Sequence, residues 1–365
     1  MKSTPTHPPL PQVPPGKGAP AGRSPGRRSL GRLFLGLGLG LFGAAPFLPG
    51  AEVNLYTARH YPGDDALYER FEERTGIQVN VVDGKGDELL QRIRAEGEQS
   101  PADVFITVDA GRLWAAEEAG ILQPVETEEL LASVPSPLRA PDGLWYGLTK
   151  RARVLFYDRA SVDPSELSTY EELADPRWKG EILIRSSSNV YNQSLLAAII
   201  AEHGEEYAEQ WAEGMVANFA RKPQSNDTGQ IRAVAAGLGD VAIANHYYYL
   251  RLMQSDNPDD QEIVEKVGMF FPNQESRGTH VNISGGGVVA GAENREEAIR
   301  FLEFLVSPEA QAVLADGNYE FPVNPNAPVP PYLSDYSFRE DPLPASIIGE
   351  FNPEAIRIFD RAGWR

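Results

Sequence analysis

Tyrosine and histidine side chains gather at three points of this sequence, each beside a predicted strand or at the start of a predicted helix. The first is Arg59-His60-Tyr61, which follows the β-prone segment Val53–Leu55. The second is Tyr191, just after Ser186–Asn189, and the third is Asn245-His246-Tyr247-Tyr248-Tyr249, after an apolar strand. Because α/β folds present residues to a cleft at the carboxyl ends of their strands, we expect the three groups to face one cleft.

Four phenols and one imidazole together favour one kind of ligand. A phenol has a pKa of about 10, so it is a poor ligand for weak Lewis acids at neutral pH. A small trivalent cation can deprotonate its ligands, and phenolate is a hard anionic oxygen that suits Fe(III) better than softer divalent metals. Several phenolates and one imidazole would neutralise such an ion and fill most of its coordination sphere.

Each of these residues has a simpler interpretation when it is taken alone. A tyrosine beside a strand is often a packing residue with a polar tip in water, and a tyrosine run is often an aromatic strand edge. Their joint placement at one predicted cleft is what favours a site. His246 is not expected to bind, because adjacent residues rarely both reach one ion. His203 is interpreted as a capping or surface residue, and His280 has no predicted role.

The charge and the cysteine content exclude several classes of protein. The chain has 365 residues, a formal charge of −19 and no cysteine. Its first 50 residues hold six Lys or Arg and no acidic residue, so the remainder carries −25. An acidic surface repels nucleic acid and anionic membranes, and solubility is its simplest consequence. Without cysteine there is no thiolate site, Fe–S cluster, disulfide or lipid-modified N-terminal Cys.

The N-terminus resembles an export signal. A basic, Pro-rich leader precedes the apolar run Leu33–Leu48, which at about 16 residues is short for a spanning helix of roughly 20. Arg27-Arg28-Ser29-Leu30 is similar to a twin-arginine signal, and an ordinary secretory signal is the equal alternative. Cleavage at Ala45 or Ala51 and retention as an uncleaved anchor are all open. Residues 1–51 are therefore assigned to the leader.

The rest of the chain predicts an α/β fold with two lobes. Its start alternates strand and helix as in a doubly wound sheet, with Asp64 and Asp65 as candidate N-caps of the first helix and Gly76 as its end. Roughly 310 residues exceed what a single core usually supports. Lys150–Tyr157 and Gly268–Phe271 are the candidate strands that cross between lobes. The predicted first lobe comprises 52–149 and 281–320, and the second 150–280 and 321–365.

Three motifs make the sequence similar to a known family. Arg59-His60-Tyr61, Ser188-Asn189-Val190-Tyr191 and Asn245-His246-Tyr247-Tyr248 resemble those of the ferric-ion-binding proteins of bacterial ABC importers, in the cyanobacterial iron-uptake branch. The resemblance runs from about Val53 to about Asn324, and the segment 301–311 resembles type II periplasmic binding proteins in general. It implies that type II fold, with a mixed sheet flanked by helices in each lobe and a cleft between the lobes.

The resemblance also implies the ligands. Carried over by position, the metal ligands are His60 and Tyr61 from the first lobe with Tyr191, Tyr247 and Tyr248 from the second. Tyr249 stands where the family usually has an aliphatic residue, so which two of the three consecutive tyrosines bind depends on the alignment of Asn245 and Arg251-Leu252. Candidates to hold a small anion such as carbonate, or to bond to the phenolates, are Arg59, Arg151 and Arg153; a salt bridge is the alternative for each.

The implied function is Fe(3+) binding and delivery to an ABC permease and its ATPase by a periplasmic or exported monomer that is not a lipoprotein, not an enzyme and not a nucleic-acid-binding protein. One alternative keeps the fold and changes the ligand to a sugar, a polyamine or an oxyanion. Another is a non-haem iron enzyme with tyrosinate ligands, which would need an open coordination position. No Ser-His-Asp set, phosphate loop or carboxylate pair stands at convincing spacing.

Overall fold

The computed structural model describes residues 50–59 and 61–365, which form an α/β protein with a mixed sheet. The predicted leader, apart from its last two residues, lies outside the described residues. Among the described residues, no helix is long and apolar enough to cross a membrane. The strands are β1 (Glu52–Thr57), β2 (Gln78–Asp83), β3 (Val104–Val108), β4 (Leu122–Gln123), β5 (Tyr146–Asp158), β6 (Ile182–Leu183), β7 (Val241–Asn245), β8 (Val267–Phe270), β9 (Val281–Val289) and β10 (Phe321–Pro322).

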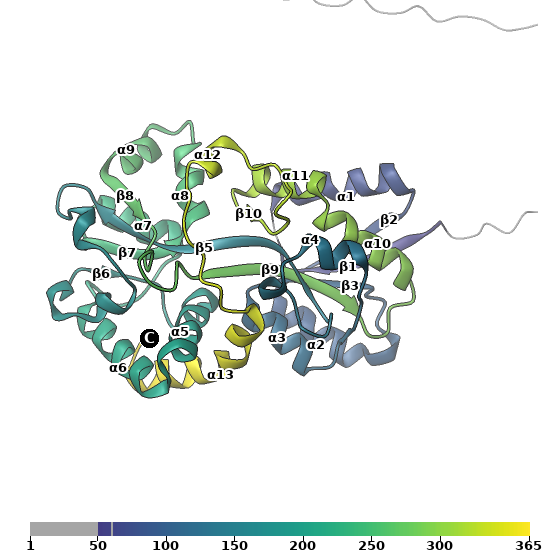
Figure 1. Ribbon diagram of the computed structural model, residues 1–365, viewed down its shortest axis with the longest axis horizontal. Coiled ribbons are helices and arrows are strands. Elements are labelled where there is room, and N and C mark those ends of the chain that lie inside the picture. Colours follow the sequence, from purple (N-terminus) through teal and green to yellow (C-terminus); the bar gives the residue numbers. More distant parts are fainter. Residues whose placement is uncertain (1–49, 60) are drawn as a thin grey trace, which may run out of the picture. The chain divides into compact units, whose positions relative to one another are not determined.

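Helices cover both faces of this sheet (Figure 1). The α-helices are α1 (Pro62–Thr75), α2 (Gly86–Glu96), α3 (Ala110–Glu118), α4 (Glu128–Ser133), α5 (Val190–His203), α6 (Glu205–Asn218), α7 (Asp227–Ala235), α8 (His246–Met253), α9 (Pro258–Lys266), α10 (Arg295–Val306), α11 (Pro308–Asn318), α12 (Pro331–Ser334) and α13 (Ala345–Ala362). Short 3-10 helices are Gly97–Gln99, Ser136–Leu138, Pro164–Glu166, Glu171–Ala174 and Pro176–Trp178.

The sheet has the order β2-β1-β3-β9-β5-β7-β6. β1 pairs in parallel with both β2 and β3, which confirms the predicted doubly wound start. Gly76 ends α1 in the left-handed conformation, as predicted. The predicted N-caps of that helix are wrong: Tyr61 is the N-cap residue, and Asp64 lies in the first turn, where its carboxylate binds Arg59 and Asn318 instead.

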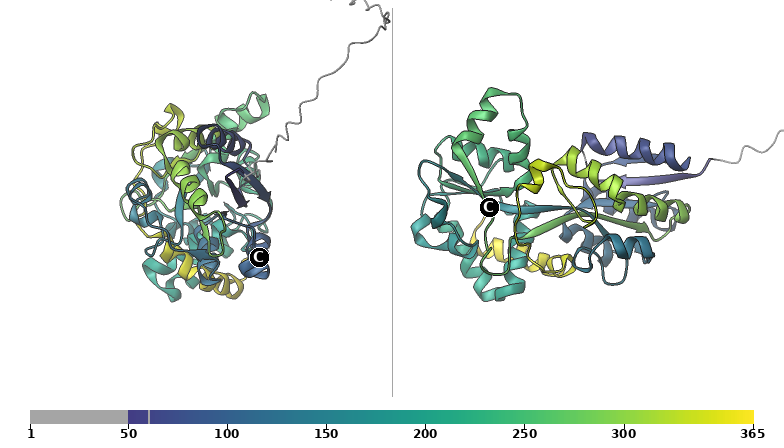
Figure 2. Two further views of the ribbon diagram at one scale, coloured as in Figure 1. Left: turned by 90° about the vertical axis from the view of Figure 1, so that its right-hand side faces the viewer. Right: turned by 45° about the horizontal axis from the view of Figure 1, so that its top comes forward.

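Two antiparallel strands, β5 and β9, join the halves of the sheet. The first part of β5 pairs with β9, and its second part pairs with β7 and β8. β9 also pairs with β3. The predicted crossing Lys150–Tyr157 lies within β5, whereas the other candidate, Gly268–Phe271, falls largely on β8, which pairs with the distal end of β5. We call the elements around β1–β3 the first lobe and those around β6–β8 the second lobe; the right-hand view of Figure 2 shows both.

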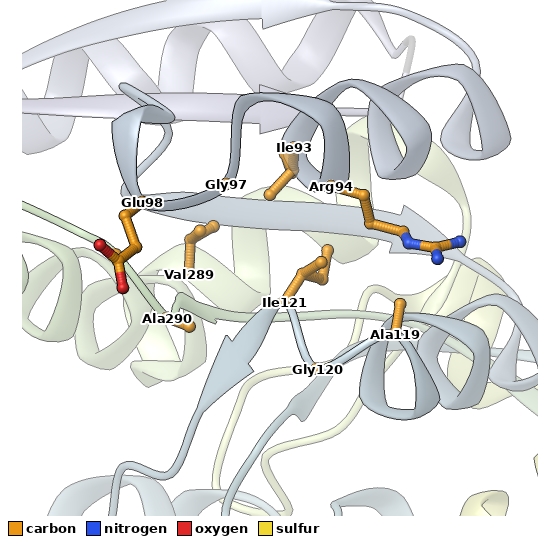
Figure 3. A pocket seen from close by; sticks show the side chains of 10 residues that line it. Ile93, Arg94, Gly97, Glu98, Ala119, Gly120, Ile121, Val289 and Ala290 are labelled. Carbon is orange, nitrogen blue, oxygen red and sulfur yellow. The ribbon is translucent and has the colours of Figure 1, made fainter.

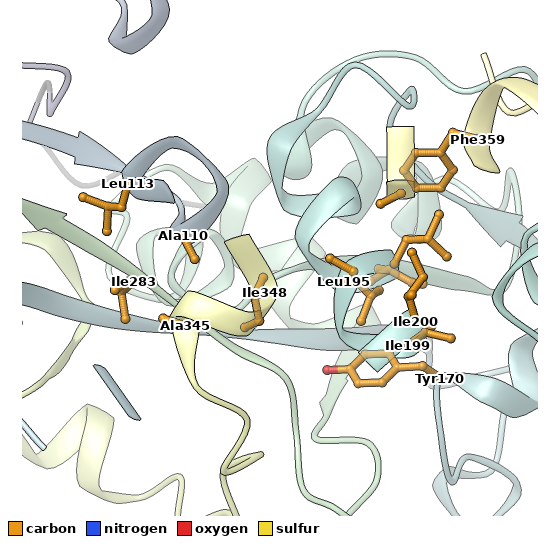
Figure 4. Close-up of a cluster of buried hydrophobic side chains, with 14 of the residues drawn as sticks. Ala110, Leu113, Tyr170, Leu195, Ile199, Ile200, Ile283, Ala345, Ile348 and Phe359 are labelled. Carbon is orange, nitrogen blue, oxygen red and sulfur yellow. The ribbon is translucent and has the colours of Figure 1, made fainter. Parts of the chain in front are cut away.

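Each lobe has an apolar core, and a third cluster joins them. One core packs β1 and β3 against α1, α10 and α11, and another packs the second half of β5 against α7 and α8. The third cluster contains side chains of α3, α5 and α13 (Figure 4). Helix α13, which the sequence analysis does not predict, packs against α5 and α6 of the second lobe and against α3 of the first. It therefore spans both lobes.

Candidate metal site

Tyr61 lies in the connection between β1 and α1, at the N-terminus of the helix. The Arg59 guanidinium lies over its ring at 4.7 Å from the ring centre. The following Pro62 occupies the first helical turn, where proline suits the backbone and ends the preceding extended segment. The position of His60, the other predicted ligand of this segment, lies outside the described residues.

Tyr191 is the second residue of α5, two positions after the N-cap residue Asn189. The guanidinium groups of Arg151, Arg153 and Arg185 all lie 5.8–5.9 Å from the centre of its ring. The ring of Tyr191 therefore lies among three guanidinium groups that are each paired with a carboxylate, at the end of the helix where the backbone dipole favours negative charge.

Tyr247 and Tyr248 begin α8 immediately after strand β7, and their ring centres are 4.2 Å apart. The hydroxyl oxygen of Tyr247 is 3.5 Å from that of Tyr191. Tyr249 lies elsewhere: its hydroxyl donates to the carbonyl oxygen of Val267 at 2.7 Å, and its ring packs on Phe156. The structure thus places two of the three consecutive tyrosines beside Tyr191 and the third in the core of the second lobe.

The electrostatics show that Tyr61 of the first lobe belongs to the same cluster. Burial raises the pKa of Tyr61 to about 12, with the negative charge of Glu320 adding to the rise and Arg151 opposing it. Burial also raises the pKa of Tyr247, and its three neighbouring phenols, Tyr191, Tyr61 and Tyr248, raise it further in that order. Phenols crowded in this way stay protonated at neutral pH unless a cation compensates the charge of their ionised forms.

Arg251 completes the cluster and was used in the sequence analysis only to align the tyrosines. Its guanidinium lies 4.9 Å from the ring centre of Tyr247, 5.7 Å from that of Tyr248 and 5.3 Å from that of Tyr61. The signal in the sequence was its spacing, because residues three and four apart share a face of a helix. Arg251 joins α8 of the second lobe to Tyr61 of the first.

A chain of buried ion pairs centred on Glu320 lies beside the tyrosine cluster. The carboxylate of Glu320 lies 3.3 Å from Arg59 and 3.2 Å from Arg151, and the side chains of all three are at most 2% exposed. Arg59 also binds Asp64 at 3.0 Å, and Arg151 donates to Ser284. The Nε and Nη1 atoms of Arg151 are buried without a hydrogen-bond partner among the described residues. Glu320 was missed in the sequence because nothing local marks an acid that will lie between two distant arginines.

Arg153 has the salt bridge that the sequence analysis gave as the alternative. Its guanidinium binds Asp227 at 3.0 Å, Asn245 at 3.2 Å and Asn192 at 2.6 Å. Only its Nε lacks a partner among the described residues. Its bonds therefore tie β5 to α5 and to the start of α8, the two helices that carry the second-lobe tyrosines.

His246, His203 and His280 each lie in a different environment. The His246 ring stacks on Phe321, and its Nδ1 accepts from the backbone N–H of Ala152 at 3.2 Å. Burial lowers the pKa of His246 to about 3. His203 lies at the surface within 3.1 Å of Glu171. His280 is buried, and within residues 50–59 and 61–365 neither of its ring nitrogens has a hydrogen-bond partner.

A cavity of about 280 Å³ opens beside the cluster, between Tyr61 and Tyr191, with Arg59, Lys85 and Arg112 among its lining residues. A second cavity of about 370 Å³ lies elsewhere in the first lobe, between α2, β4 and the end of β9 (Figure 3). Its lining is mostly aliphatic side chains and glycines, with Arg94 and Glu98 at its ends, so it offers no phenol to a metal. Within residues 50–59 and 61–365, no three His, Cys, Asp or Glu are grouped to hold a metal ion.

The chain belongs to the family of bacterial extracellular solute-binding proteins, which it matches over residues 99–339. It is 54% identical over 316 residues to iron uptake protein A2 of Synechocystis, and the alignment covers 86% of this chain and 90% of that protein. It is 28% identical over 332 residues to the major ferric iron-binding protein of Neisseria meningitidis, which covers 90% of this chain and 97% of that protein.

Solved structures agree with this assignment. A structure of FutA (IdiA) from Trichodesmium, in complex with iron and citrate ligands, is 57% identical, has a TM-score of 0.84 and covers 86% of this chain and 100% of that chain. Apo FutA2 from Synechocystis is 54% identical and has a TM-score of 0.83; the match covers 86% of this chain and 99% of that chain. These similarities confirm the predicted resemblance and the two-lobed fold of type II periplasmic binding proteins.

Proposed function

We propose that this chain is the solute-binding component of an ABC importer and binds Fe(III) between its two lobes. The observation that carries the proposal is the meeting of four phenols from three distant segments, with the hydroxyl groups of Tyr191 and Tyr247 only 3.5 Å apart. Hard anionic oxygens in this number favour a small trivalent cation over late divalent metals. The likeness to iron uptake protein A2 and to iron-bound FutA supports the same cargo.

The proposed ligands are His60 and Tyr61 of the first lobe and three tyrosines of the second lobe, Tyr191, Tyr247 and Tyr248. Of the three arginines considered for an anion, Arg151 is the candidate that we retain, because its Nε and Nη1 are buried beside the phenols and have no partner in the part of the chain that the structure describes. Two donors of one guanidinium suit a small planar oxyanion such as carbonate, or the phenolate oxygens themselves.

Transport follows from the distribution of these ligands. We propose lobe limits of 52–149 with 281–320 and of 150–280 with 321–365. An ion held by both lobes favours their closed arrangement, and binding can shift that equilibrium only by the difference in affinity between open and closed states. The closed, loaded protein would then deliver iron to a permease with its ATPase.

The proposed setting is outside the cytoplasm. Export would use a secretory or a twin-arginine signal within residues 1–51, and the chain would act as a monomer. We propose no enzymatic activity, because five protein ligands leave little room for the open coordination position that metal catalysis needs.

A ferric titration of the purified protein tests the proposal. Ferric citrate should load one iron per chain and produce an orange to purple colour from phenolate-to-iron charge transfer. Small-angle scattering should show a smaller radius of gyration for the loaded protein. A protein that stays colourless and takes up no iron would overturn the proposal, and the same samples can then be screened with sugars, polyamines and oxyanions.

A further inference from the structure

Asp109 has an unusual backbone at the junction of β3 and α3. It is 1% exposed, and its φ of 87° and ψ of 133° lie in a region that residues other than glycine rarely adopt. Such a conformation persists only where surrounding contacts enforce it, and strain of this kind is typical of functional positions. The contacts of Asp109 therefore indicate what the conformation is for.

Those contacts come from three separate segments. The backbone N–H of Asp109 donates to the carbonyl oxygen of Ile283 at 2.8 Å. Its carboxylate accepts from the N–H of Gly111 at 2.9 Å, from Nδ2 of Asn282 at 2.7 Å and from Oγ of Ser194 at 2.7 Å. Asn282 in turn accepts from the N–H of Ala110 at 2.9 Å. One carboxylate thus joins α3 of the first lobe, the connecting strand β9 and helix α5 of the second lobe.

The bond to Ser194 links the first lobe to the helix that carries a candidate ligand. Ser194 lies three residues after Tyr191 in α5, so the two residues lie about one turn apart on the same side of the helix. Apolar side chains next to the bonded residues close around this point: Ala110, Ile283 and Leu195 belong to one buried cluster with Ile348 of α13 (Figure 4). Water is therefore kept away from the Asp109–Ser194 bond, which strengthens it.

We infer that Asp109 is a positioning residue for the metal site: when the lobes are closed, its carboxylate holds helix α5, and with it Tyr191, against the first lobe. This inference rests on the proposed function, because it assigns Asp109 a role in how firmly iron is held. Asp109 itself would not touch the metal. It keeps a second-lobe ligand in register with Tyr61, and its strained backbone aims the carboxylate at α5.

The test compares two serine variants that each lose one hydrogen bond from a serine hydroxyl to a carboxylate. Ser194→Ala removes the bond between the lobes but leaves the other contacts of Asp109 in place. Ser100→Ala is the control, because Ser100 is also buried and its hydroxyl donates at the same 2.7 Å to the carboxylate of Glu96, inside the first lobe. The Glu96 side chain is 25% exposed, so Ser100→Ala should lose less thermal stability than Ser194→Ala.

The rate of iron release to a chelator should distinguish the two variants. Ser194→Ala should release iron about tenfold faster than wild type, as expected for a buried hydrogen bond to a charged group, while the charge-transfer maximum stays in place because the ligands are unchanged. Ser100→Ala should release iron at the wild-type rate. Asp109→Gly should also release iron fast, yet be more stable than Asp109→Ala, because glycine tolerates the backbone conformation. Equal release rates for wild type and Ser194→Ala would overturn the inference.

A second measurement keeps the inference testable if the proposed function fails. If the wild-type protein binds no iron, hydrogen exchange of the first turn of α5 still reports on the positioning role. That exchange should be faster in Ser194→Ala than in both wild type and Ser100→Ala. Unchanged exchange would reject the role of Asp109 whether or not the protein binds iron.

Discussion

The hydroxyl oxygens of Tyr191 and Tyr247 lie 3.5 Å apart although 56 residues separate them in the chain. Two neutral phenols can share a hydrogen bond at this distance, but two phenolates would repel each other strongly. The pair is therefore stable in two states: both phenols protonated with no cation bound, or both phenols ionised around a bound cation. This property connects metal binding to proton release and makes the site sensitive to pH.

Replacing the tyrosine pair should abolish iron binding without unfolding the protein. Tyr247→Phe with Tyr248→Phe keeps both rings, whose centres are 4.2 Å apart, but removes two anionic ligands. We expect the affinity for ferric iron to fall more than about a thousandfold. Visible absorbance during a ferric citrate titration measures it.

The neighbouring residue supplies the control. Tyr249→Phe removes a hydroxyl that donates to Val264 at 3.1 Å and to Val267 at 2.7 Å in the core. It should cost about 1 kcal/mol of stability and leave iron binding intact. Iron binding that survives in the double variant, or that is lost in Tyr249→Phe, would show that the site is misplaced.

Iron affinity should fall steeply with falling pH. The pKa of Tyr61 is raised to about 12 and that of Tyr247 lies well above its usual value, so both phenols are protonated at neutral pH and must release a proton on binding. If all four tyrosines bind, the logarithm of the affinity should rise by about four per pH unit near neutrality. Competition with a chelator of known pH dependence measures the slope. A slope near zero would mean that neutral groups bind the metal.

The positions of the tyrosines could be predicted because the relevant signals are local. Strands of apolar residues, such as β3 and β7, are visible in the sequence, and Tyr61 and Tyr247 lie a few residues after the carboxyl ends of β1 and β7. Ligands of α/β folds bind at the carboxyl ends of strands, so a site at these tyrosines could be expected. The motif resemblance then selected Tyr247 and Tyr248, whose rings lie together while Tyr249 points into the core.

The interactions that depend on distant segments could not be predicted. Helix α13 contains Pro353, and its partners α3, α5 and α6 come from both lobes. Asp64 looked like a helix cap because caps are local, but a buried arginine competes for its carboxylate. Glu320 looked like any other acid in an acidic chain. Its burial between Arg59 and Arg151 depends on where the turn after α11 meets β5 and the end of β1.

Replacing Glu320 should destabilise the protein and change the electrostatics of Tyr61. Glu320→Gln leaves two buried arginines with less compensating charge, and breaking a buried ion pair in this way costs about 3 kcal/mol or more. Because the charge of Glu320 helps to raise the pKa of Tyr61, that pKa should fall. Denaturant unfolding measures the first effect, and NMR of ring-labelled tyrosine the second.

A surface glutamate serves as the comparison for Glu320. Glu309 pairs with Arg74 at 3.0 Å, and both side chains are about half exposed. Exposed ion pairs contribute only about 0–1 kcal/mol, so Glu309→Gln should change stability little and leave the pKa of Tyr61 in place. Equal losses of stability in the two variants would contradict the role of the buried chain.

Acid should destabilise the protein through His280. Burial, together with the positive charges of Arg277 and Arg153, lowers the pKa of His280 from 6.5 to about 3. The unfolded chain takes up a proton at this histidine below pH 6.5, whereas the folded protein does so only near pH 3. Its contribution to stability is therefore complete above pH 6.5 and is lost as the pH falls from 6.5 to 3, by at most about 5 kcal/mol. His280→Leu removes the titrating group and two nitrogens that have no partner among the residues described, so stability at pH 7.5 should be kept or raised. Between pH 6.5 and 4 the variant should lose less stability than wild type in urea unfolding of the metal-free protein. Parallel curves for the two proteins over that range would assign the acid sensitivity to other groups.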